Sequence, residues 1–302
     1  MTDSAMTDPA MTERLPLPPV AEPYHLPFHY GALHQLGVDY LVDPEPARAL
    51  LADRHPELVA AEFDGSACVS VNYQLYFAQY PNGAGVTQEI EINLIAHPAV
   101  CAALVPAVDY RAYARGHDQT RMLGIARLHV LCDNPLAIDA GSKLYAEPKY
   151  PGWFEVTMPS PNSPVVGTGW SISCRAAEYA PDGGLARREV ELFALEAELA
   201  ALVDEPVNNA PVTGYGTDPK GRLLAGPMNV YQPYRYWELD AGQADRVRLT
   251  VTDAPGEAGR PGRDLVTLVG DAPAVGVWSH QSPPVAAHNR PYYLPSSGGQ
   301  RR

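Results

Sequence analysis

Lys149 is the residue whose surroundings most favour covalent chemistry. It follows Pro148 in the stretch AIDAGSKLYAEPKYPGW, residues 137–153. Because proline fixes its own φ angle and moves the preceding residue out of the α region, we expect Lys149 to leave an extended segment at a defined angle. Tyr150 and Trp153 follow closely, and burial among aromatic side chains lowers the pKa of a lysine and leaves a neutral, nucleophilic amine. By spacing alone, a solvated loop lysine fits the same residues.

This stretch resembles a run of the form A-I-x-x-G-x-x-L-x-x-x-P-K in the acetoacetate decarboxylase family. The matching residues are Ala137, Ile138, Gly141, Leu144, Pro148 and Lys149, with Asp133 and Asn134 just upstream. A second block, residues 71–89, is similar to the family's aromatic-rich strand, its G-x-G turn and its active-site glutamate, which fall at Gly83, Gly85 and Glu89. The two blocks occur in the family's order.

The resemblance implies that Lys149 forms a Schiff base with a substrate ketone and that Glu89 acts as the acid/base that moves protons. Gln74, Glu147 and Tyr76 are the expected substrate-binding residues. The resemblance also implies a cone-like β-barrel with the lysine inside, no cofactor, no metal, a small oxo-acid or ketone substrate, and a homo-oligomer.

The family pattern is incomplete next to the lysine. The family has a second lysine where this chain has Tyr150, so burial, and not an adjacent cation, would have to lower the pKa of Lys149. The family also has a glutamate at the position of Gln74 and a tyrosine at the position of Glu147. These exchanges change the charge balance of the expected pocket.

The family's N-terminal active-site arginine pairs here with Leu33 or His34, and residues 24–42 contain no arginine. Arginine binds a carboxylate through two parallel hydrogen bonds, so its loss favours an aldol, dehydration or related lyase step over acetoacetate decarboxylation. A basic cluster could supply the missing anion clamp or could form a solvated loop face. Its residues are Arg111, Arg115, His117 and Arg121.

Two other classes of function stay open. The exchanges beside Lys149 are compatible with a non-catalytic binding module, or pseudoenzyme, on the same barrel. A metal enzyme could instead use His25, His29 and His34, although Pro27 and nearby glycines argue against the helix that would align them.

Composition excludes several other classes. The formal net charge of −13 disfavours nucleic acid as a partner, because phosphate contacts need clustered lysine and arginine. The sequence has no run of 18 apolar residues and no secretory signal, so we expect a cytoplasmic protein without a membrane span. The four cysteines are widely spaced, which favours buried free thiols over a zinc site or a disulfide framework.

Short strands dominate the predicted elements, which favours an α+β protein on a curved antiparallel sheet. We expect a disordered leader at residues 1–22, a single domain at 23–295 and a loose tail at 296–302. Helices are predicted at 43–53 and 189–203, a break at Gly141, and a loop at 206–219. Strands are predicted at 58–63, 67–78, 87–94, 123–131, 154–158, 165–174, 246–252 and 264–269.

Two of these strands alternate in a way that bears on the site. In 67–78, Gln74 and Tyr76 lie on the face opposite the apolar residues and could line a cavity. In 87–94, Glu89, Glu91 and Asn93 share one face. That face is polar, so it would meet solvent in an open sheet or a ligand inside a barrel.

Overall fold

The computed structural model describes residues 16–81, 83–118, 120–163, 169–208, 212–231, 233–286 and 289–290. Of the predicted leader, residues 1–15 lie outside this described part, and residues 16–22 form neither helix nor strand. The predicted tail, residues 296–302, lies wholly outside it. None of the described helices has the length and apolar character needed to span a membrane.

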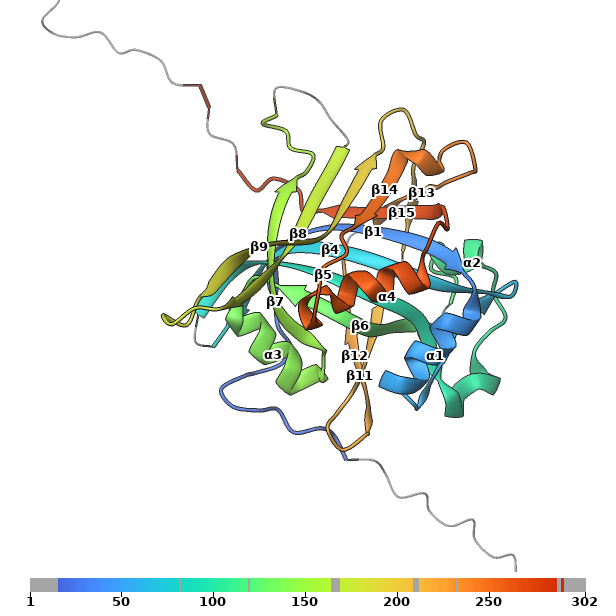
Figure 1. Ribbon diagram of the computed structural model, residues 1–302, viewed down its shortest axis with the longest axis horizontal. Helices are drawn as coiled ribbons and strands as arrows, with labels where there is room; N and C mark the ends of the chain where they lie inside the picture. Colours follow the sequence, from blue (N-terminus) through green and yellow to red (C-terminus); the bar gives the residue numbers. More distant parts are fainter. Residues whose placement is uncertain are drawn as a thin grey trace, which may run out of the picture.

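The fold is built on one large, curved sheet whose strands are mostly antiparallel (Figure 1). Its central strands, in spatial order, are β1 (Tyr30–Val42), β4 (Ser66–Tyr80), β5 (Gly83–Pro98) and β6 (Gly124–Cys132). Beyond β1 come β15 (Ala274–Gln281), β13 (Tyr234–Glu238) and β10 (Glu205–Val207). Beyond β6 come β7 (Lys149–Thr157), which is parallel to β6, and then β8 (Gly169–Tyr179), β9 (Leu185–Glu198) and β14 (Val247–Val251). The short strands are β2 (Leu58–Ala60) on β5, β3 (Glu62–Phe63) on β4, and the hairpin of β11 (Val212–Thr217) and β12 (Leu223–Met228), whose first strand pairs with β6.

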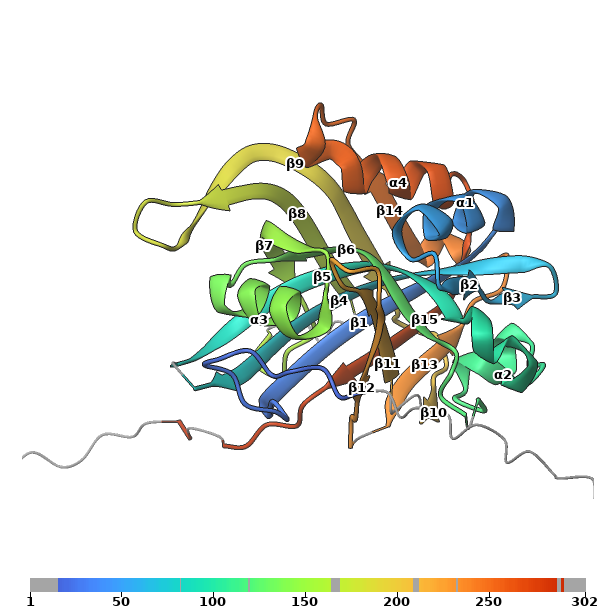
Figure 2. The same cartoon turned by 90° about the horizontal axis from the view of Figure 1, so that it is seen from below.

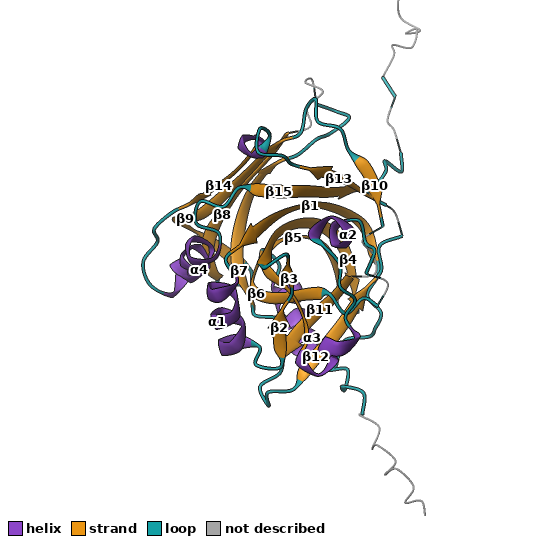
Figure 3. Ribbon diagram, turned by 90° about the vertical axis from the view of Figure 1, so that its right-hand side faces the viewer, coloured by secondary structure: helices purple, strands orange, loops and turns teal. Residues whose placement is uncertain are grey.

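The sheet curls around an interior but its hydrogen-bond order does not close. Within the described residues, that order runs from β10 at one end to β14 at the other. Figure 3 shows β1, β4, β5 and β6 curving around a central space, with the short helix α2 (Tyr110–Ala114) in front of it. The predicted α+β fold on a curved antiparallel sheet is confirmed, and the implied barrel is present as an open, curled sheet.

The apolar core lies on the outer face of the central strands. Figure 2 shows β8 and β9 arching over these strands beside two helices, α1 (Pro44–Arg54) and α4 (Arg260–Leu268). Val71 and Tyr73 of β4 and Ile92 of β5 pack in one cluster with Phe193 of β9 and Leu265 of α4. The alternate residues of the same strands point into the curl, as side chains of a strand must.

Both inward carboxylates of β5 are buried. Glu89 and Glu91 are only 5% and 1% exposed. The alternative in which this polar face meets solvent is therefore wrong, because the curvature of the sheet encloses it.

The helices that flank the site have clear start signals. Asp43 caps α1 by accepting a hydrogen bond from the Glu45 backbone, which confirms the helix predicted at 43–53. Asn134 caps α3 (Pro135–Tyr145) in the same way, and Ala146 ends it with a φ angle of 52°. The predicted break at Gly141 is wrong, because α3 continues through this residue.

Three other predicted elements are wrong. Residues 189–203 belong mainly to β9 and not to a helix, because β8 and β14 pair with it on either side and burial there alternates with period two. The strand predicted at 264–269 is part of α4, whose buried residues recur at helical spacing. The loop predicted at 206–219 contains parts of β10 and β11.

Candidate active site

Three neighbouring strands, β1, β4 and β5, place polar side chains in one row on the inner face, and β7 adds a lysine to it. Gln35 of β1 pairs in register with Gln74 of β4. Glu89 of β5 pairs with Gln74 on one side and with Cys132 of β6 on the other. Lys149 is the first residue of β7, which pairs with β6, and its side chain extends into the same interior toward Glu89.

The Lys149 amine lies between two carboxylates. Its Nζ atom is 2.5 Å from Oε2 of Glu89 and 3.5 Å from Oε2 of Glu147. The Lys149 side chain is only 5% exposed, so this ion pair is shielded from bulk water. The solvated-loop alternative for Lys149 is therefore wrong, while its placement in an extended segment is confirmed by β7.

Gly141 makes room for this arrangement. A Cβ atom at this position would lie 2.3 Å from Oε2 of Glu147 and 2.9 Å from Cδ of Lys149. Any side chain here would push the two residues apart, since real Cβ atoms do not approach other atoms so closely. The glycine of the A-I-x-x-G run thus lets helix α3 pack directly against the lysine.

The charge state of Lys149 differs from the sequence-based expectation. Burial by itself lowers the pKa of Lys149, but Glu89 and Glu147 outweigh it and hold the pKa well above its usual value. Burial raises the pKa of Glu89 against the opposing effect of Lys149. Glu147 is also buried, yet Arg127 and Lys149 lower its pKa. The resting amine is therefore an ammonium, and the predicted lowering of its pKa is wrong.

Glu89 accepts hydrogen bonds from two of the other predicted residues. The hydroxyl of Tyr76 donates to its Oε2 atom at 2.9 Å, and the amide of Gln74 donates to its Oε1 atom at 3.2 Å. Gln35 in turn donates to Gln74 at 3.0 Å and accepts from the hydroxyl of Tyr234 at 2.9 Å. The structure thus brings Lys149, Glu89, Glu147, Gln74 and Tyr76 together, and adds Gln35 and Tyr234 behind them.

Arg127 is an inward cation that the sequence did not indicate. Its Nε atom is 2.9 Å from Oε1 of Glu91, and its Nη2 atom is 3.6 Å from Oε1 of Glu147. A register shift opposite Ile92 and Asn93 places Arg127 on the inner face although His129, two residues later, lies on the outer face. Strict alternation along a strand would put Arg127 and His129 on the same face, so the sequence alone does not predict that they point in opposite directions. Glu91, by contrast, was recoverable from its alternation with Glu89.

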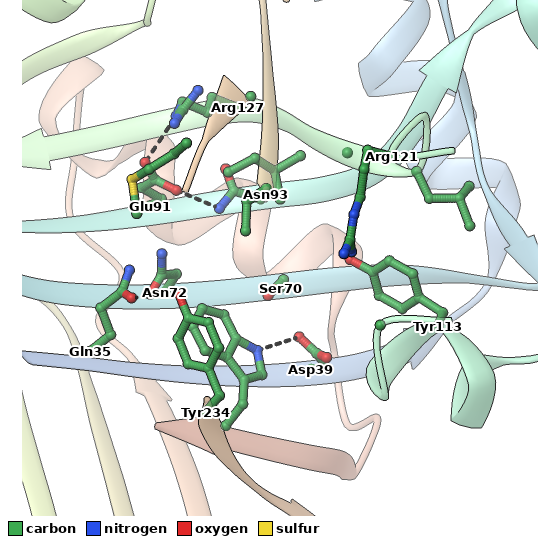
Figure 4. Close-up of a pocket in the computed structure, with 18 of the residues that line it drawn as sticks. Gln35, Asp39, Ser70, Asn72, Glu91, Asn93, Tyr113, Arg121, Arg127 and Tyr234 are labelled. Carbon is green, nitrogen blue, oxygen red and sulfur yellow. Dashed lines mark hydrogen bonds and ion pairs between the residues drawn. The ribbon is translucent and has the colours of Figure 1, made fainter. Parts of the chain in front are cut away.

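A polar cavity extends from this row along the inner face (Figure 4). Gln35 and Gln74 line its part next to Glu89, while Asp39, Ser70 and Asn93 line its far part. Arg127 lies on the wall between them, where it pairs with Glu91 (Figure 4). Arg127 also lines a second cavity, which Lys149 and Glu147 line together with residues of the outer face. Cavities with hydrogen-bonding walls are expected of a small-molecule site.

The predicted basic cluster divides between surface and cavity. Arg111 and Arg115 form ion pairs with Glu238, and Arg115 also pairs with Glu205. Arg121 instead lines the cavity, near Tyr113 (Figure 4). The cations that face the cavity, and so could bind an anionic substrate, are therefore Arg121 and the unpredicted Arg127.

The three N-terminal histidines do not form a metal site. Within the described residues, which include His25, His29 and His34, no three His, Cys, Asp or Glu side chains gather closely enough to hold a metal ion. The arrangement that the metal-enzyme hypothesis required is absent from this part of the chain.

A scan against family models and a search of curated proteins find no match for the chain. Similar solved structures include the enduracididine biosynthesis enzyme MppR complexed with pyruvate, at a TM-score of 0.56 and 16% identity over 92% of this chain and 93% of that one. MppR complexed with the condensation product of pyruvate and imidazole 4-carboxaldehyde has a TM-score of 0.54 and 15% identity, and covers 84% of each chain. An acetoacetate decarboxylase-like enzyme from Sphingomonas wittichii RW1 has a TM-score of 0.51 and 16% identity over 83% of this chain and 87% of that one.

These likenesses show the fold. The chain has the acetoacetate decarboxylase-like fold, and the resemblance seen in its two sequence blocks is confirmed at that level. The identities of 15–16% mark it as a divergent example of this fold.

Proposed function

We propose that this protein is a cofactor-free lyase that forms a Schiff base between Lys149 and the ketone of a small oxo acid. The observation that carries the proposal is the buried Lys149 amine, 2.5 Å from Glu89 and 3.5 Å from Glu147 on the inner face of the sheet. Imine formation needs a positioned amine and a group that moves protons beside it, and this pair supplies both.

Glu89 would activate the amine. The resting ammonium has no free electron pair, so its proton must first move to the adjacent Oε2 atom of Glu89. Burial favours this transfer, because it replaces two buried charges by two neutral groups. The free pair of Nζ then attacks the ketone carbon, and the ketone oxygen takes up protons and leaves as water. The product is a protonated imine on Lys149.

The protonated imine accepts electrons from the neighbouring carbon, so a carbanion there is stabilised as an enamine. This enamine can add to an aldehyde, and the adduct can then eliminate water. The same enamine also forms when a neighbouring carboxylate leaves as CO2. Glu147, 3.5 Å from the nitrogen, would hold the substrate or move a second proton. Arg127 would face the substrate carboxylate from the cavity wall.

Aldol or dehydration chemistry is favoured over decarboxylation of acetoacetate. Gln74 replaces a carboxylate of the family pattern, and the N-terminal arginine of that pattern is missing. In addition, the structurally similar MppR has been solved with pyruvate and with a condensation product of pyruvate and an aldehyde. Pyruvate is therefore the first ligand to test.

A non-catalytic binding module is the second candidate, and one observation favours it. The two carboxylates hold the pKa of Lys149 well above its usual value, so the resting group is an ammonium. An ammonium binds a carboxylate without forming a covalent bond. Only a trapping experiment separates the two candidates.

The test is reductive trapping with pyruvate and borohydride, read by intact mass and peptide mapping. The chain has three lysines, so Lys143, which is half exposed six residues away, provides a matched control. We expect a mass gain equal to pyruvic acid less one oxygen atom in the wild type and in Lys143→Ala, and none in Lys149→Ala. Lys149→Arg should also fail, because it keeps the charge but cannot form an imine.

Two outcomes would overturn the lyase proposal. An adduct that persists in Lys149→Ala would place the chemistry elsewhere. No adduct with pyruvate or a panel of oxo acids, combined with calorimetric binding of the same acids, would favour the binding module.

A further inference from the structure

The cavity contains two buried hydrogen-bond acceptors, on Asn72 and Asn93. The Oδ1 atoms of Asn72 and Asn93 are buried, and neither has a hydrogen-bond partner among the residues that the structure describes. Both residues line the cavity and point into it (Figure 4). A buried acceptor without a partner loses its hydration free energy, so such atoms usually meet a ligand or an ordered water.

The orientation of Asn93 follows from its neighbours. Its Nδ2 atom donates to Oε2 of Glu91 at 2.9 Å, and a carboxylate cannot donate in return. The amide oxygen must therefore point away from Glu91. Oε1 of Glu91 is itself paired with Arg127 at 2.9 Å, so the charge of this carboxylate is balanced.

The register of the strands places these oxygens at a defined reach from Lys149. The backbone of Lys149 is in register with Glu91 through Val130, but its Nζ atom reaches Glu89, so Glu89 marks the level of the amine. Asn72 pairs with Glu91, two residues farther along β5. Asn93 lies four residues from Glu89 on the same face. At the usual rise of a strand, the two levels are about 7 and 13 Å beyond Glu89.

We propose that the part of the cavity lined by Asn72 and Asn93 is a subsite for an uncharged hydrogen-bond donor at the distal end of the substrate. This inference rests on the proposed function, because it places the ketone of the substrate at Lys149. The substrate class is then an oxo acid with a chain of several carbons that ends in a hydroxyl group. Pyruvate would fill only the part next to the lysine.

The charges around the subsite favour a neutral donor over a cation. The two free acceptors are neutral amide oxygens, and Glu91 is already paired with Arg127. Asp39 is buried and accepts hydrogen bonds from Tyr110 at 3.0 Å and Trp278 at 3.4 Å. Burial raises the pKa of Asp39, and the hydrogen bonds that it accepts oppose this shift. Arg121 adds a cation to the wall of the same cavity, so the charges near the subsite do not favour a cationic ligand.

The test compares two oxo acids that differ only at the distal end. Calorimetry with the full chain measures binding of 7-hydroxy-2-oxoheptanoate and of 2-oxooctanoate, in which a methyl group replaces the hydroxyl. We expect the hydroxyl compound to bind about tenfold more tightly to the wild type, because it satisfies an acceptor that the methyl compound leaves unpaired. In Asn72→Leu and Asn93→Leu, the ratio should fall to about twofold or less.

The control variant is Asn162→Leu, which makes the same exchange at an exposed position and should keep the wild-type ratio. Should a leucine variant fail to fold, Asn72→Ala and Asn93→Ala replace it, with circular dichroism as the check. Equal or tighter binding of 2-oxooctanoate by the wild type overturns the subsite and leaves a cavity that holds only water. An unchanged ratio in both asparagine variants overturns it as well.

Pyruvate trapping separates this result from the proposed function. If pyruvate is trapped on Lys149 but the hydroxyl group does not increase affinity, the lyase proposal is supported and the subsite is rejected. If nothing is trapped but the preference for the hydroxyl compound depends on Asn72 and Asn93, the subsite is supported and the protein is a binding module.

Discussion

Two buried clusters of charged and polar residues lie on opposite faces of the same two strands, β6 and β7. The inner cluster consists of Lys149, Glu89, Glu147, Arg127 and Glu91. The outer cluster consists of Arg54, His129, Tyr150 and Asp264. Neighbours in sequence are thus divided between them, since Lys149 points inward and Tyr150 outward.

The outer cluster ties helices to the sheet. Oδ2 of Asp264 in α4 is 2.5 Å from Nη2 of Arg54 in α1 and 2.6 Å from Nε2 of His129 in β6. Nδ1 of His129 is 2.8 Å from the hydroxyl of Tyr150. Burial lowers the pKa of His129, which fits a neutral ring that donates to Asp264 and accepts from Tyr150.

The difference shows that buried charge alone does not mark a functional site. The outer cluster joins α1, α4, β6 and β7, and its side chains bind one another. In the inner cluster, Lys149 is within ion-pair distance of two carboxylates, and Glu91 and Arg127 line a cavity with the unsatisfied acceptors of Asn72 and Asn93. A second cavity is lined by residues of both clusters, so a cavity by itself does not distinguish them. Substitutions in the outer cluster should therefore change stability, and substitutions in the inner cluster should change chemistry.

The largest expected effect is on stability, from Asp264→Asn. Removing one partner of a buried ion pair leaves the Arg54 charge uncompensated, so the free energy of unfolding should fall by about 3 kcal/mol. Urea unfolding followed by circular dichroism measures it.

The Arg54 and His129 contacts lower the pKa of Asp264, so its contribution is present above the unfolded pKa and is lost as the pH falls through the folded value. The difference from wild type should therefore shrink below about pH 4.

Asp204→Asn is the matched control for Asp264→Asn. Asp204 pairs with Arg235 through two hydrogen bonds, but that pair is largely at the surface. Its loss should cost about 1 kcal/mol or less. Both variants should still be trapped with pyruvate under conditions where they are folded. Loss of trapping in a folded Asp264→Asn protein would assign the outer cluster to the reaction and contradict the comparison.

The second effect is on the pH dependence of trapping, from Glu89→Gln. Because the folded pKa of Lys149 is raised, the free amine is scarce at neutral pH, and the trapping rate of the wild type should rise with pH. Glu89 is the largest cause that raises this pKa. Its replacement should move the midpoint of the profile to lower pH by about one unit or more. The plateau rate should fall about tenfold or more, because the proton acceptor is gone.

Asp39→Asn removes another carboxylate of the inner face, in the far part of the cavity, and should leave the midpoint unchanged. A midpoint in Glu89→Gln that equals that of the wild type would show that Glu89 does not control the charge of Lys149.

The smallest expected effect is on the trapping rate, from alanine substitution of two glycines in the sequence blocks that resemble the family. Gly141→Ala places a methyl group 2.3 Å from Glu147 and 2.9 Å from Lys149, so the trapping rate should fall about tenfold as the amine is displaced. Gly85→Ala meets only Asn134 at 3.5 Å, an ordinary contact, and should change the rate less than about twofold. Equal rates in the two variants would mean that the packing of α3 does not position the lysine.

The expected site residues could be read from the sequence because they fall in local runs. Gly141 and Lys149 belong to the run at residues 137–153, and Glu89 belongs to the run at 71–89. Period-two alternation along β5 then adds Glu91 and Asn93 to the same inner face. The α1 helix was predictable for the same reason, since Asp43 and its proline act within one turn.

The charge state of Lys149 depends on contacts that no local pattern contains. Glu89 and Glu147 approach Nζ from β5 and from the end of α3, and together they reverse the effect of burial on its pKa. Arg127 faces inward only because of a register shift between β5 and β6. The β9 segment, whose leucines have helical spacing, is a strand because β8 and β14 bind both of its edges.

The sequence by itself therefore determined which residue types are available for chemistry, the strand-rich class of the fold and the start of α1. These depend on neighbours in the chain, on side-chain period and on capping. Only the tertiary structure decided which polar face is enclosed, which cations reach the cavity and whether the lysine is charged. Those properties depend on strand pairing and on the distance between charges far apart in sequence, because electrostatic energy and desolvation are set by three-dimensional contact.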